Sequence, residues 1–423
     1  MQMQLTAGLA SEKVKTQFSK LYGQNGTALA GERIQALYDT HTHRFGKKER
    51  VRFFSAPGGT ELAGNHTDHN LGKVLAAAVN LDTVMAASKN TTGVITLYSE
   101  GFSSHCVVDT RDLGAHDAEK GVDTALVRGV CARMAQLGYT IGGFDAVTTS
   151  SVLVGSGLSS SAAFEVLLVT ALDCLYGKGE MDGIVKAQIA RYAENYYFAK
   201  PCGLMDQAAS ALGGLTALDF KDETPKVHNL TFDFAAKGYS LVVVNTGSAH
   251  DDLTDHYAAI PAEMRSVAAC YGESALRGVS RSQFLDELRR LRACTSDRAL
   301  LRALHYFNEN ERVDAMVAAL KRDDLPEYFR LCIDSGESSW KLLQNITAGA
   351  KDQPLALALA LCETMLKGTG AWRVHGGGFA GTIQAYVPMD TMPRFIKTMN
   401  GVFGENACTA LAIRPLGAIE LVF

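Results

Sequence analysis

The alternation of apolar and polar positions changes character twice along the chain. In residues 1–48, apolar side chains recur at roughly helical spacing, namely at Leu5, Leu9, Val14, Phe18 and Leu21. A polar stretch at 23–26 follows them. This spacing predicts an amphipathic helical extension. From Val51 onward, short apolar runs alternate with glycines and polar turns, which predicts β-strands. The predicted strands cover residues 51–55, 74–81, 94–98 and 144–154.

Two long helices are predicted after the last of these strands. The first covers about residues 160–176, with a serine N-cap and Gly177 at its end. The second begins after Asp182, and its apolar face comprises Val185, Ile189, Tyr192, Ala193 and Tyr196. Glu194 lies one residue round from that face, so its position alone leaves a solvated flank and a functional role equally open.

The second half of the chain is mainly helical between residues 257 and 367. A buried strand is predicted before it, at 239–244, and strands return at 373–374, 382–387 and 410–423. No linker or repeat marks a domain boundary. We therefore place one at the Gly213-Gly214 pair, which predicts a helical extension (1–48), an N-terminal domain (49–214) and a C-terminal domain (215–423).

Composition narrows the class of protein. The chain has 423 residues, 47% hydrophobic and 20% charged, with a net charge of -4, which is typical of a globular protein and gives no basic footprint for nucleic acid. The nine cysteines are odd in number and form no Cys-x-x-Cys pair, which favours reduced thiols over disulfides or a zinc site. No signal peptide or membrane span is predicted, so we expect a soluble cytoplasmic protein. The sequence does not specify an oligomeric state, and a monomer is compatible with it.

A glycine- and serine-rich loop joins the strand at 144–154 to the helix at 160–176. Its residues are Gly155, Ser156, Gly157, Leu158, Ser159, Ser160 and Ser161. Glycines let the main chain approach a phosphate closely, and the first N–H groups of a helix point toward it. Serine hydroxyls there can bind Mg²⁺. The loop therefore predicts a phosphate site, with a serine-capped turn as the alternative; its spacing matches no Walker, Rossmann or serine hydrolase motif.

Two further segments, with the serine loop, resemble the three signature motifs of the GHMP kinases. One is residues 56–70, which is similar to the galactokinase signature, and the other is the glycine-rich segment 374–382. Residues 202–207 (Cys-Gly-Leu-Met-Asp-Gln), with Glu194 eight residues before the cysteine, also resemble galactokinases, as does the tail at 414–418. The motifs occur in family order from about residue 50 to the C-terminus.

This resemblance implies an α/β (α+β) fold of two domains with the active site in the cleft between them. It implies that residues 155–161 bind the ATP phosphates, that Ser161 and Glu194 hold Mg²⁺, and that Gly376 to Gly378 form the floor of the site. It implies sugar contacts from Asn65, His66, Asp68, Gly203 and Tyr257. Asp206 would face the anomeric hydroxyl, where a carboxylate can direct or accept its proton; the alternative is that Asp206 merely begins a helix.

Three positions of the 56–70 segment depart from the galactokinase pattern. The family has a basic residue directly after Pro-Gly, and here that position is Gly59. Loss of such a cation costs roughly 10- to 10³-fold in rate, unless another cation replaces it; Arg50, Arg52 and Lys200 are the candidates in sequence. Asn65 stands where galactokinases usually carry Glu, and His69 where they carry Tyr, which together favour tolerance of a 6-carboxylate.

Three functions follow from these residues. The first is transfer of the ATP γ-phosphoryl group to the anomeric hydroxyl of galactose. The second, prompted by Asn65, is the same reaction on galacturonate or another hexose derivative. The third, prompted by Gly59, is a sensor that binds ATP and sugar without turnover, since ligand binding and transition-state stabilisation are separable.

Overall fold

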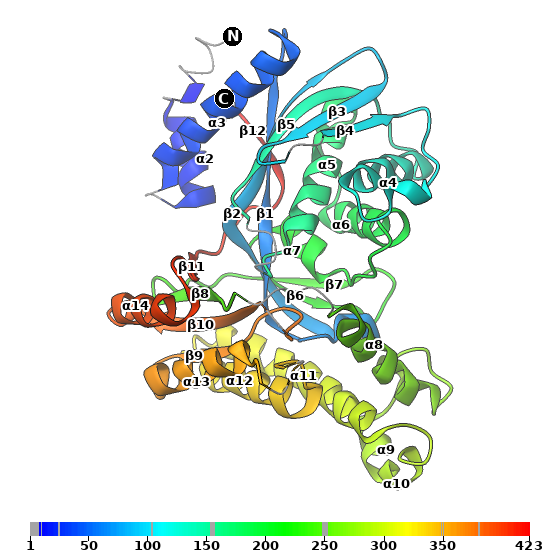
Figure 1. Cartoon of the computed structure of the whole chain (residues 1–423), viewed down its shortest axis with the longest axis vertical. Coiled ribbons are helices and arrows are strands. Elements are labelled where there is room, and N and C mark those ends of the chain that lie inside the picture. The colour runs from blue at the N-terminus through cyan, green and yellow to red at the C-terminus, as the bar shows by residue number, and fades with distance from the viewer. Residues whose placement is uncertain are drawn as a thin grey trace.

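The computed structural model describes residues 8–423 except 10, 24, 25, 103, 104, 153–156, 248–252, 348, 350 and 380. Within these residues the strands form one sheet of eight strands and one of four, each with helices packed on it (Figure 1). The predicted mixed α/β class is therefore confirmed.

The larger sheet has the strand order β12-β1-β2-β5-β3-β4, and β6 and β7 extend it from β2. Its strands are β1 (Arg52–Ala63), β2 (Lys73–Lys89), β3 (Val94–Ser99), β4 (His105–Asp109), β5 (Phe144–Ser150), β6 (Leu215–Asp219), β7 (Lys226–Leu230) and β12 (Ile419–Leu421). All its named pairs are antiparallel except β3 with β5, which run parallel.

Strand β1 is longer than the predicted 51–55. Proline and glycine weaken a strand, yet β1 continues through Pro57, Gly58 and Gly59. Its pairing with β2 shifts register between Pro57 and Gly59 and again between Glu61 and Ala63. Such irregularities absorb residues that cannot follow a regular ladder. The first half of the 56–70 motif is therefore a buried strand, and only its second half is a turn.

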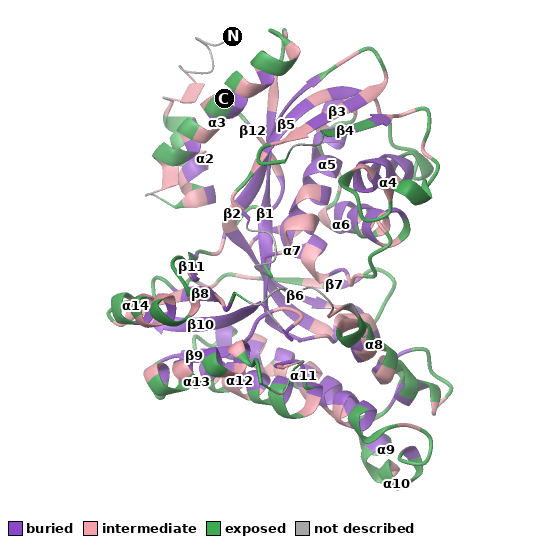
Figure 2. Cartoon of the chain, viewed as in Figure 1, coloured by how far each residue is buried: buried purple, intermediate pink, exposed green. Residues whose placement is uncertain are grey.

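Helices cover both faces of the larger sheet. The predicted N-terminal helices are confirmed as α2 (Glu12–Tyr22) and α3 (Thr27–Phe45), and they pack on the face that contains Phe53. Phe54, the next residue, points to the opposite face because side chains alternate along a strand. That face is covered by α4 (Asp123–Gln136), α5 (Ser160–Tyr176), α6 (Gly183–Tyr192) and α7 (Met205–Leu212). The central strands are consequently buried along most of their length (Figure 2).

The smaller sheet has the order β11-β8-β10-β9 and supports the helical second half. Its strands are β8 (Tyr239–Asn245), β9 (Ala371–Val374), β10 (Thr382–Pro388) and β11 (Cys408–Leu411). The helices here are α8 (Thr254–Ala269), α9 (Arg281–Asp286), α10 (Leu288–Leu291), α11 (Asp297–Lys321), α12 (Leu325–Ser338), α13 (Pro354–Leu366) and α14 (Met392–Phe403). None of the described helices has both the length and the hydropathy that a bilayer span requires.

Strand pairing crosses the predicted boundary at residue 214. β6 and β7 follow that position but belong to the larger sheet. The predicted strand 410–423 is two strands: β11 lies in the smaller sheet and β12 pairs with β1 in the larger one. The buried Arg414 lies in the connection, where its guanidinium donates to the Gly417 carbonyl and to the Ser55 hydroxyl of β1. The C-terminal segment therefore ties the two sheets together.

Candidate active site

The start of α5 lies beside β1. Gly155 and Ser156 of the serine loop fall outside the described residues; Gly157, Leu158, Ser159, Ser160 and Ser161 are described. Helix α5 begins at Ser160 and its N-cap residue is a serine, as predicted, but this Ser159 has a left-handed backbone (φ 60°) and its side chain caps no N–H of the helix. Its hydroxyl instead donates to the Gly59 carbonyl at 3.4 Å. The first N–H groups of α5 are thus not occupied by a side-chain cap.

Glycines allow three segments to meet at this point. A Cβ on Gly58 would lie 2.7 Å from the Leu158 carbonyl oxygen, and the Gly59 N–H donates to that oxygen at 3.1 Å. Gly157 has a φ of +71°, and a Cβ there would lie 2.8 Å from Nδ1 of His375, beyond the end of β9. The loop is therefore held between β1 and the segment that opens the glycine-rich turn. A larger residue at position 58 or 157 would not permit this close approach.

Glu194 is buried, not on a solvated flank. It lies in the π-helical turn Ala193–Tyr197 that ends α6, and it is 2% exposed. A π turn contains one residue more than an α-helical turn, which rotates the side chains that follow it. Because of this π turn, the apolar face predicted for the helix after Asp182 is wrong at its C-terminal end. Tyr196 is 67% exposed, and Tyr197 is buried in its place.

A polar network joins the start of α5 to α7 through Glu194. Ser161 Oγ donates to Glu194 Oε1 at 3.1 Å, and Gln207 Nε2 donates to Glu194 Oε2 at 2.7 Å. Gln207 Nε2 also contacts Glu165 Oε2 at 3.2 Å. The structure therefore brings Ser161 and Glu194 together, as the resemblance implied.

Sequence reasoning missed Glu165 and the part that Gln207 plays. Glu165 is fully buried, and within the described structure its Oε1 has no hydrogen-bond partner. Burial, followed by the nearby Glu194 charge, raises the pKa of Glu165 well above its usual value. The available signal was spacing, since Glu165 follows Ser161 by four residues and so lies on the same face of α5.

Asp206 lies in the first turn of α7 and is half-buried. The helix begins after Leu204, so Asp206 is not its cap. Burial raises the pKa of Asp206 to about 6; a hydrogen bond from Ser159 opposes this shift, and the Glu194 charge adds to it. A carboxyl group of this pKa is ionised near neutral pH yet basic enough to accept a proton. A Cβ at residue 59 would lie 3.6 Å from the Asp206 carbonyl oxygen, so β1 passes directly beside this residue.

Asp68 meets Gly203 across the site. Asp68 begins a 3-10 turn (Asp68–Asn70) after β1, and the His69 N–H donates to its Oδ1 at 2.9 Å. A Cβ on Gly203 would lie 1.6 Å from Asp68 Oδ2. The Asp68 charge also contributes to the raised pKa of Asp206. These two predicted site residues therefore lie together and close to a third.

His66 and Tyr257 lie against the glycine-rich turn. His66 Nε2 donates to the Gly377 carbonyl at 3.0 Å, and the Tyr257 hydroxyl donates to the Gly378 carbonyl at 2.8 Å. A Cβ on Gly377 would lie 2.5 Å from Tyr257 Cε1, so glycine is needed for this contact. Burial lowers the pKa of His66 to about 4, and the imidazole is therefore neutral at pH 7.

The Asn65 side chain is enclosed by other residues of the protein. It is fully buried beneath the glycine-rich turn, where its Nδ2 donates to the Gly376 carbonyl at 2.7 Å and to the Glu61 carboxylate at 3.1 Å. Its Oδ1 accepts from Asn345 Nδ2 at 2.8 Å. Glu61 is in turn paired with the buried Arg373. Both ends of the Asn65 amide are thus bonded to protein groups.

Of the three candidate cations, one reaches this site. Lys200 Nζ donates to Glu194 Oε1 at 3.0 Å. The Arg52 guanidinium instead donates hydrogen bonds to Glu420 and to the Cys174 carbonyl. Arg50 is exposed.

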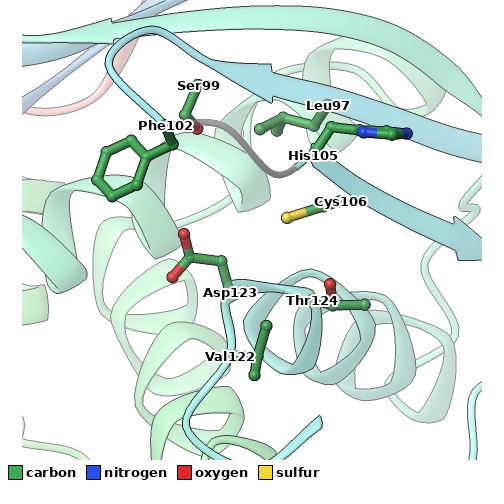
Figure 3. Close-up of a pocket in the computed structure, with 8 residues that line it drawn as sticks. All are labelled: Leu97, Ser99, Phe102, His105, Cys106, Val122, Asp123 and Thr124. Carbon is green, nitrogen blue, oxygen red and sulfur yellow. The ribbon is translucent and has the colours of Figure 1, made fainter.

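A separate cavity of about 60 Å³ lies at the end of β3 (Figure 3). The Asp123 carboxylate at the start of α4 points toward Phe102, and the cavity is also lined by Leu97, Ser99, His105, Cys106, Val122 and Thr124. Ser99 pairs with Thr148 of the parallel strand β5, whose hydroxyl donates to Ser99 Oγ at 3.0 Å. The cavity therefore lies at the end of the strand that pairs with β5, the strand that precedes the serine loop in the sequence.

Comparison with known proteins places these residues in a family. A galactokinase galactose-binding signature matches residues 39–89, and a GHMP kinases N terminal domain matches residues 125–214. The chain is 32% identical to a Streptomyces coelicolor galactokinase over 410 residues, which cover 95% of this chain and 100% of that protein. It is 29% identical to a Homo sapiens galactokinase over 380 residues, 86% of this chain and 91% of that protein.

Solved structures agree with these matches. Lactococcus lactis galactokinase complexed with galactose superimposes with a TM-score of 0.80 at 25% identity, over 91% of this chain and 99% of that one. Methanococcus jannaschii mevalonate kinase gives a TM-score of 0.62 at 13% identity, over 87% of this chain and 99% of that one. The second likeness is one of fold.

Proposed function

Because the chain belongs to the galactokinase family, we propose that it transfers the γ-phosphoryl group of ATP to the anomeric hydroxyl of galactose. The hydroxyl oxygen forms a bond to the γ-phosphorus, the bond from that phosphorus to the β,γ-bridging oxygen breaks, and ADP leaves. The hydroxyl proton passes to the Asp206 carboxylate. The observation that carries this proposal is the position of Asp206, with a pKa of about 6, beside both the start of α5 and Asp68.

The nucleotide is proposed to lie along the edge where β3 and β5 end. The ATP phosphates would accept hydrogen bonds from the N–H groups at the start of α5, which no side chain caps. The helix dipole favours negative charge there. The base would occupy the cavity beside Ser99 and Asp123, since ligands of α/β folds bind at the carboxyl ends of parallel strands. The Asp123 carboxylate can accept a hydrogen bond from an amino group of the base.

Mg²⁺ is the cofactor that this chemistry calls for. Mg²⁺ prefers a few hard oxygen ligands and keeps its remaining positions for water and phosphate. Ser161 and Glu194 lie 3.1 Å apart, and the unpartnered Oε1 of Glu165 is on the same helix as Ser161. These oxygens suit the ion, and within the described residues no cluster of three His, Cys, Asp or Glu offers a denser set. When bound, Mg²⁺ would neutralise phosphate charge.

The sugar would bind between Asp68 and the glycine-rich turn. Asp68 can accept hydrogen bonds from sugar hydroxyls, and Gly203 leaves room for its carboxylate. His66 and Tyr257 are held on the carbonyls of Gly377 and Gly378 and would present their rings to the ligand. Asn65 is assigned an indirect role, which is to hold the glycine-rich turn from below.

Galacturonate is not proposed as the substrate. Asn65, which prompted it, has no side-chain atom open to a ligand. His66 is neutral at pH 7 and supplies no positive charge to a 6-carboxylate, and His69 Nε2 already lies 3.9 Å from the Asp68 carboxylate. Asp68 and Asp206 would instead repel one.

Activity is tested by measuring ADP and sugar 1-phosphate production from Mg-ATP with galactose, galacturonate, glucose and N-acetylgalactosamine. The expected result is turnover of galactose that Asp206→Asn lowers by about 10²- to 10⁴-fold without loss of galactose binding. Full activity of that variant, or turnover of galacturonate in preference to galactose, would overturn the proposal.

A further inference from the structure

The candidate active site is rich in negative charge before any nucleotide binds. Asp68, Glu194 and Lys200 all act on the charge of Asp206, and Glu194, Lys200 and Asp206 act on that of Glu165. Three carboxylates, the Glu165 carboxyl group and one ammonium are therefore close enough to interact. A triphosphate adds further negative charge, and a phosphoryl transfer needs cations that offset it in the transition state.

The backbone around Lys200 directs its side chain into this cluster. The Lys200 N–H donates to the Glu194 carbonyl at 3.1 Å, which closes the segment after the π turn onto that turn. Ala199, directly before it, has a φ of +66°, a strained value for a residue with a Cβ. Lys200 Nζ then lies 3.0 Å from Glu194 Oε1. A strained residue held in this way is typical of a functional segment.

The Lys200 ammonium is also free to reach a ligand. Its side chain is 60% exposed, whereas its partner Glu194 is 3% exposed. The four-carbon stem of lysine can swing the charge by several ångströms without a change in the backbone. Position 59, where a Cβ would lie 3.6 Å from the Asp206 carbonyl oxygen, offers no side chain at all.

We propose that Lys200 is the catalytic cation of this site, contacting the transferring phosphoryl group in place of a basic residue at position 59; the inference rests on the proposed galactokinase activity. The ammonium leaves Glu194 for the phosphoryl oxygens when Mg-ATP binds. In the transition state it offsets the charge on those oxygens, and beside Asp206 it favours the ionised carboxylate that accepts the sugar proton.

A purely structural ion pair makes a different prediction. Lys200→Met would then lower thermal stability, because the buried Glu194 loses its ion partner, and would leave the rate constant unchanged. The two roles separate when kcat and the pH profile are measured rather than activity at a single condition.

The test compares the full-length wild type with Lys200→Met and Lys200→Arg in a coupled assay for ADP release with Mg-ATP and galactose. Lys367→Met is the matched control, since Lys367 pairs with Glu363 on an exposed face of α13. Folding of each variant is followed by thermal melting, and galactose binding by titration calorimetry. We expect Lys200→Met to lower kcat by about 10- to 10³-fold with galactose binding retained, and Lys200→Arg to keep most of the activity. Loss of the Lys200 charge should also move the acidic limb of the kcat profile to higher pH.

A second, independent arm of the test moves the positive charge from residue 200 to residue 59. A Cβ at residue 59 would lie 3.1 Å from the Ala209 Cβ, so Gly59→Arg is combined with Ala209→Gly to make room. In the Lys200→Met background this pair should restore part of kcat, while Ala209→Gly alone should not.

Three outcomes decide the matter. A Lys200→Met enzyme with wild-type kcat and pH profile would overturn the role of Lys200 and leave the galactokinase activity standing. Wild-type protein that phosphorylates another sugar but not galactose would overturn the proposed function, and the same variants would then be compared on that sugar. Wild-type protein that is folded but inactive on every sugar would overturn both, since Lys200 would not then suffice.

Discussion

The Asp68 carboxylate occupies the space in which a side chain at residue 203 would begin: a Cβ on Gly203 would lie 1.6 Å from Asp68 Oδ2. No non-bonded pair of atoms approaches so closely, so Gly203→Ala must displace the carboxylate or the turn that carries residue 203. We expect the Michaelis constant for galactose to rise by about 10- to 100-fold, the loss typical of a hydrogen bond to a charged group, with that for ATP unchanged.

Steady-state kinetics with each substrate varied in turn measures this effect. Gly401→Ala in α14 is the matched control, because nothing lies within 4 Å of a Cβ there. An unchanged Michaelis constant for galactose in a folded Gly203→Ala protein would show that Asp68 does not contact the sugar.

The pH profile should report Asp206. Burial, reinforced by Glu194 and Asp68, raises the pKa of Asp206 to about 6, so the carboxylate that accepts the proton is lost as the pH falls through that value. We expect kcat/KM for galactose to be level above pH 7 and to fall about tenfold per pH unit below pH 6. A profile that stays level down to pH 5 would exclude Asp206 as the base.

Asp206 should also destabilise the folded protein at neutral pH. The folded pKa of Asp206 lies above that of an unfolded aspartate, so the folded state binds its proton more tightly and loses stability as the pH rises from 4 to 6. Asp206→Asn removes this cost. Because the side chain is half-buried, we expect a gain of about 1 kcal/mol in the free energy of unfolding at pH 8 and little gain at pH 4. Urea denaturation at both pH values provides the measurement.

The cavity beside β3 is tested through Asp123. Asp123 is exposed overall, and partial burial of its carboxyl group raises the pKa of that group. If it accepts a hydrogen bond from the base of ATP, Asp123→Ala should raise the Michaelis constant for ATP about tenfold and leave that for galactose unchanged. Asp117→Ala, whose side chain is 94% exposed, is the control. If only the Michaelis constant for galactose changed, the nucleotide would bind elsewhere.

Periodicity predicted the elements of the fold well, because each depends on local spacing. Helices α2, α5 and α6 and the central strands follow directly from apolar patterns and from the glycine or aspartate at the end of α5 and the start of α6. The length of β1 was not predictable, since proline and glycine normally end a strand and only its pairing with β2 keeps it in the sheet. The division of 410–423 between two sheets is likewise a consequence of tertiary pairing.

The site could be predicted in part. Motifs identified Ser161, Glu194 and Asp206, which the structure brings close together. Glu165 was missed because a single buried glutamate in an apolar helix carries no motif. The burial of Asn65 could not be foreseen either, because Glu61, Gly376 and Asn345 surround it from segments up to 311 residues away in sequence.

The indirect role of Asn65 has its own test in Asn65→Asp. The substitution keeps the shape of the side chain but replaces the amide nitrogen, 3.1 Å from both oxygens of Glu61, with a carboxylate oxygen. Two buried carboxylates would then face each other, and burial already raises the pKa of Glu61. The introduced aspartate should titrate above its unfolded pKa for the same reason. The loss of stability is therefore full at pH 8 and recovers as the pH falls and one carboxyl group takes up a proton.

We expect Asn65→Asp to lower the free energy of unfolding by about 3 kcal/mol at pH 8, as for a buried charge without a partner, and by much less at pH 5. Asn229→Asp on the exposed strand β7 is the control and should change stability little at either pH. Urea denaturation is followed at both pH values, and galactose binding at pH 8 in variants that remain folded. If Asn65 instead lined an open sugar site, Asn65→Asp would leave stability unaltered at both pH values and change only the affinity for galactose.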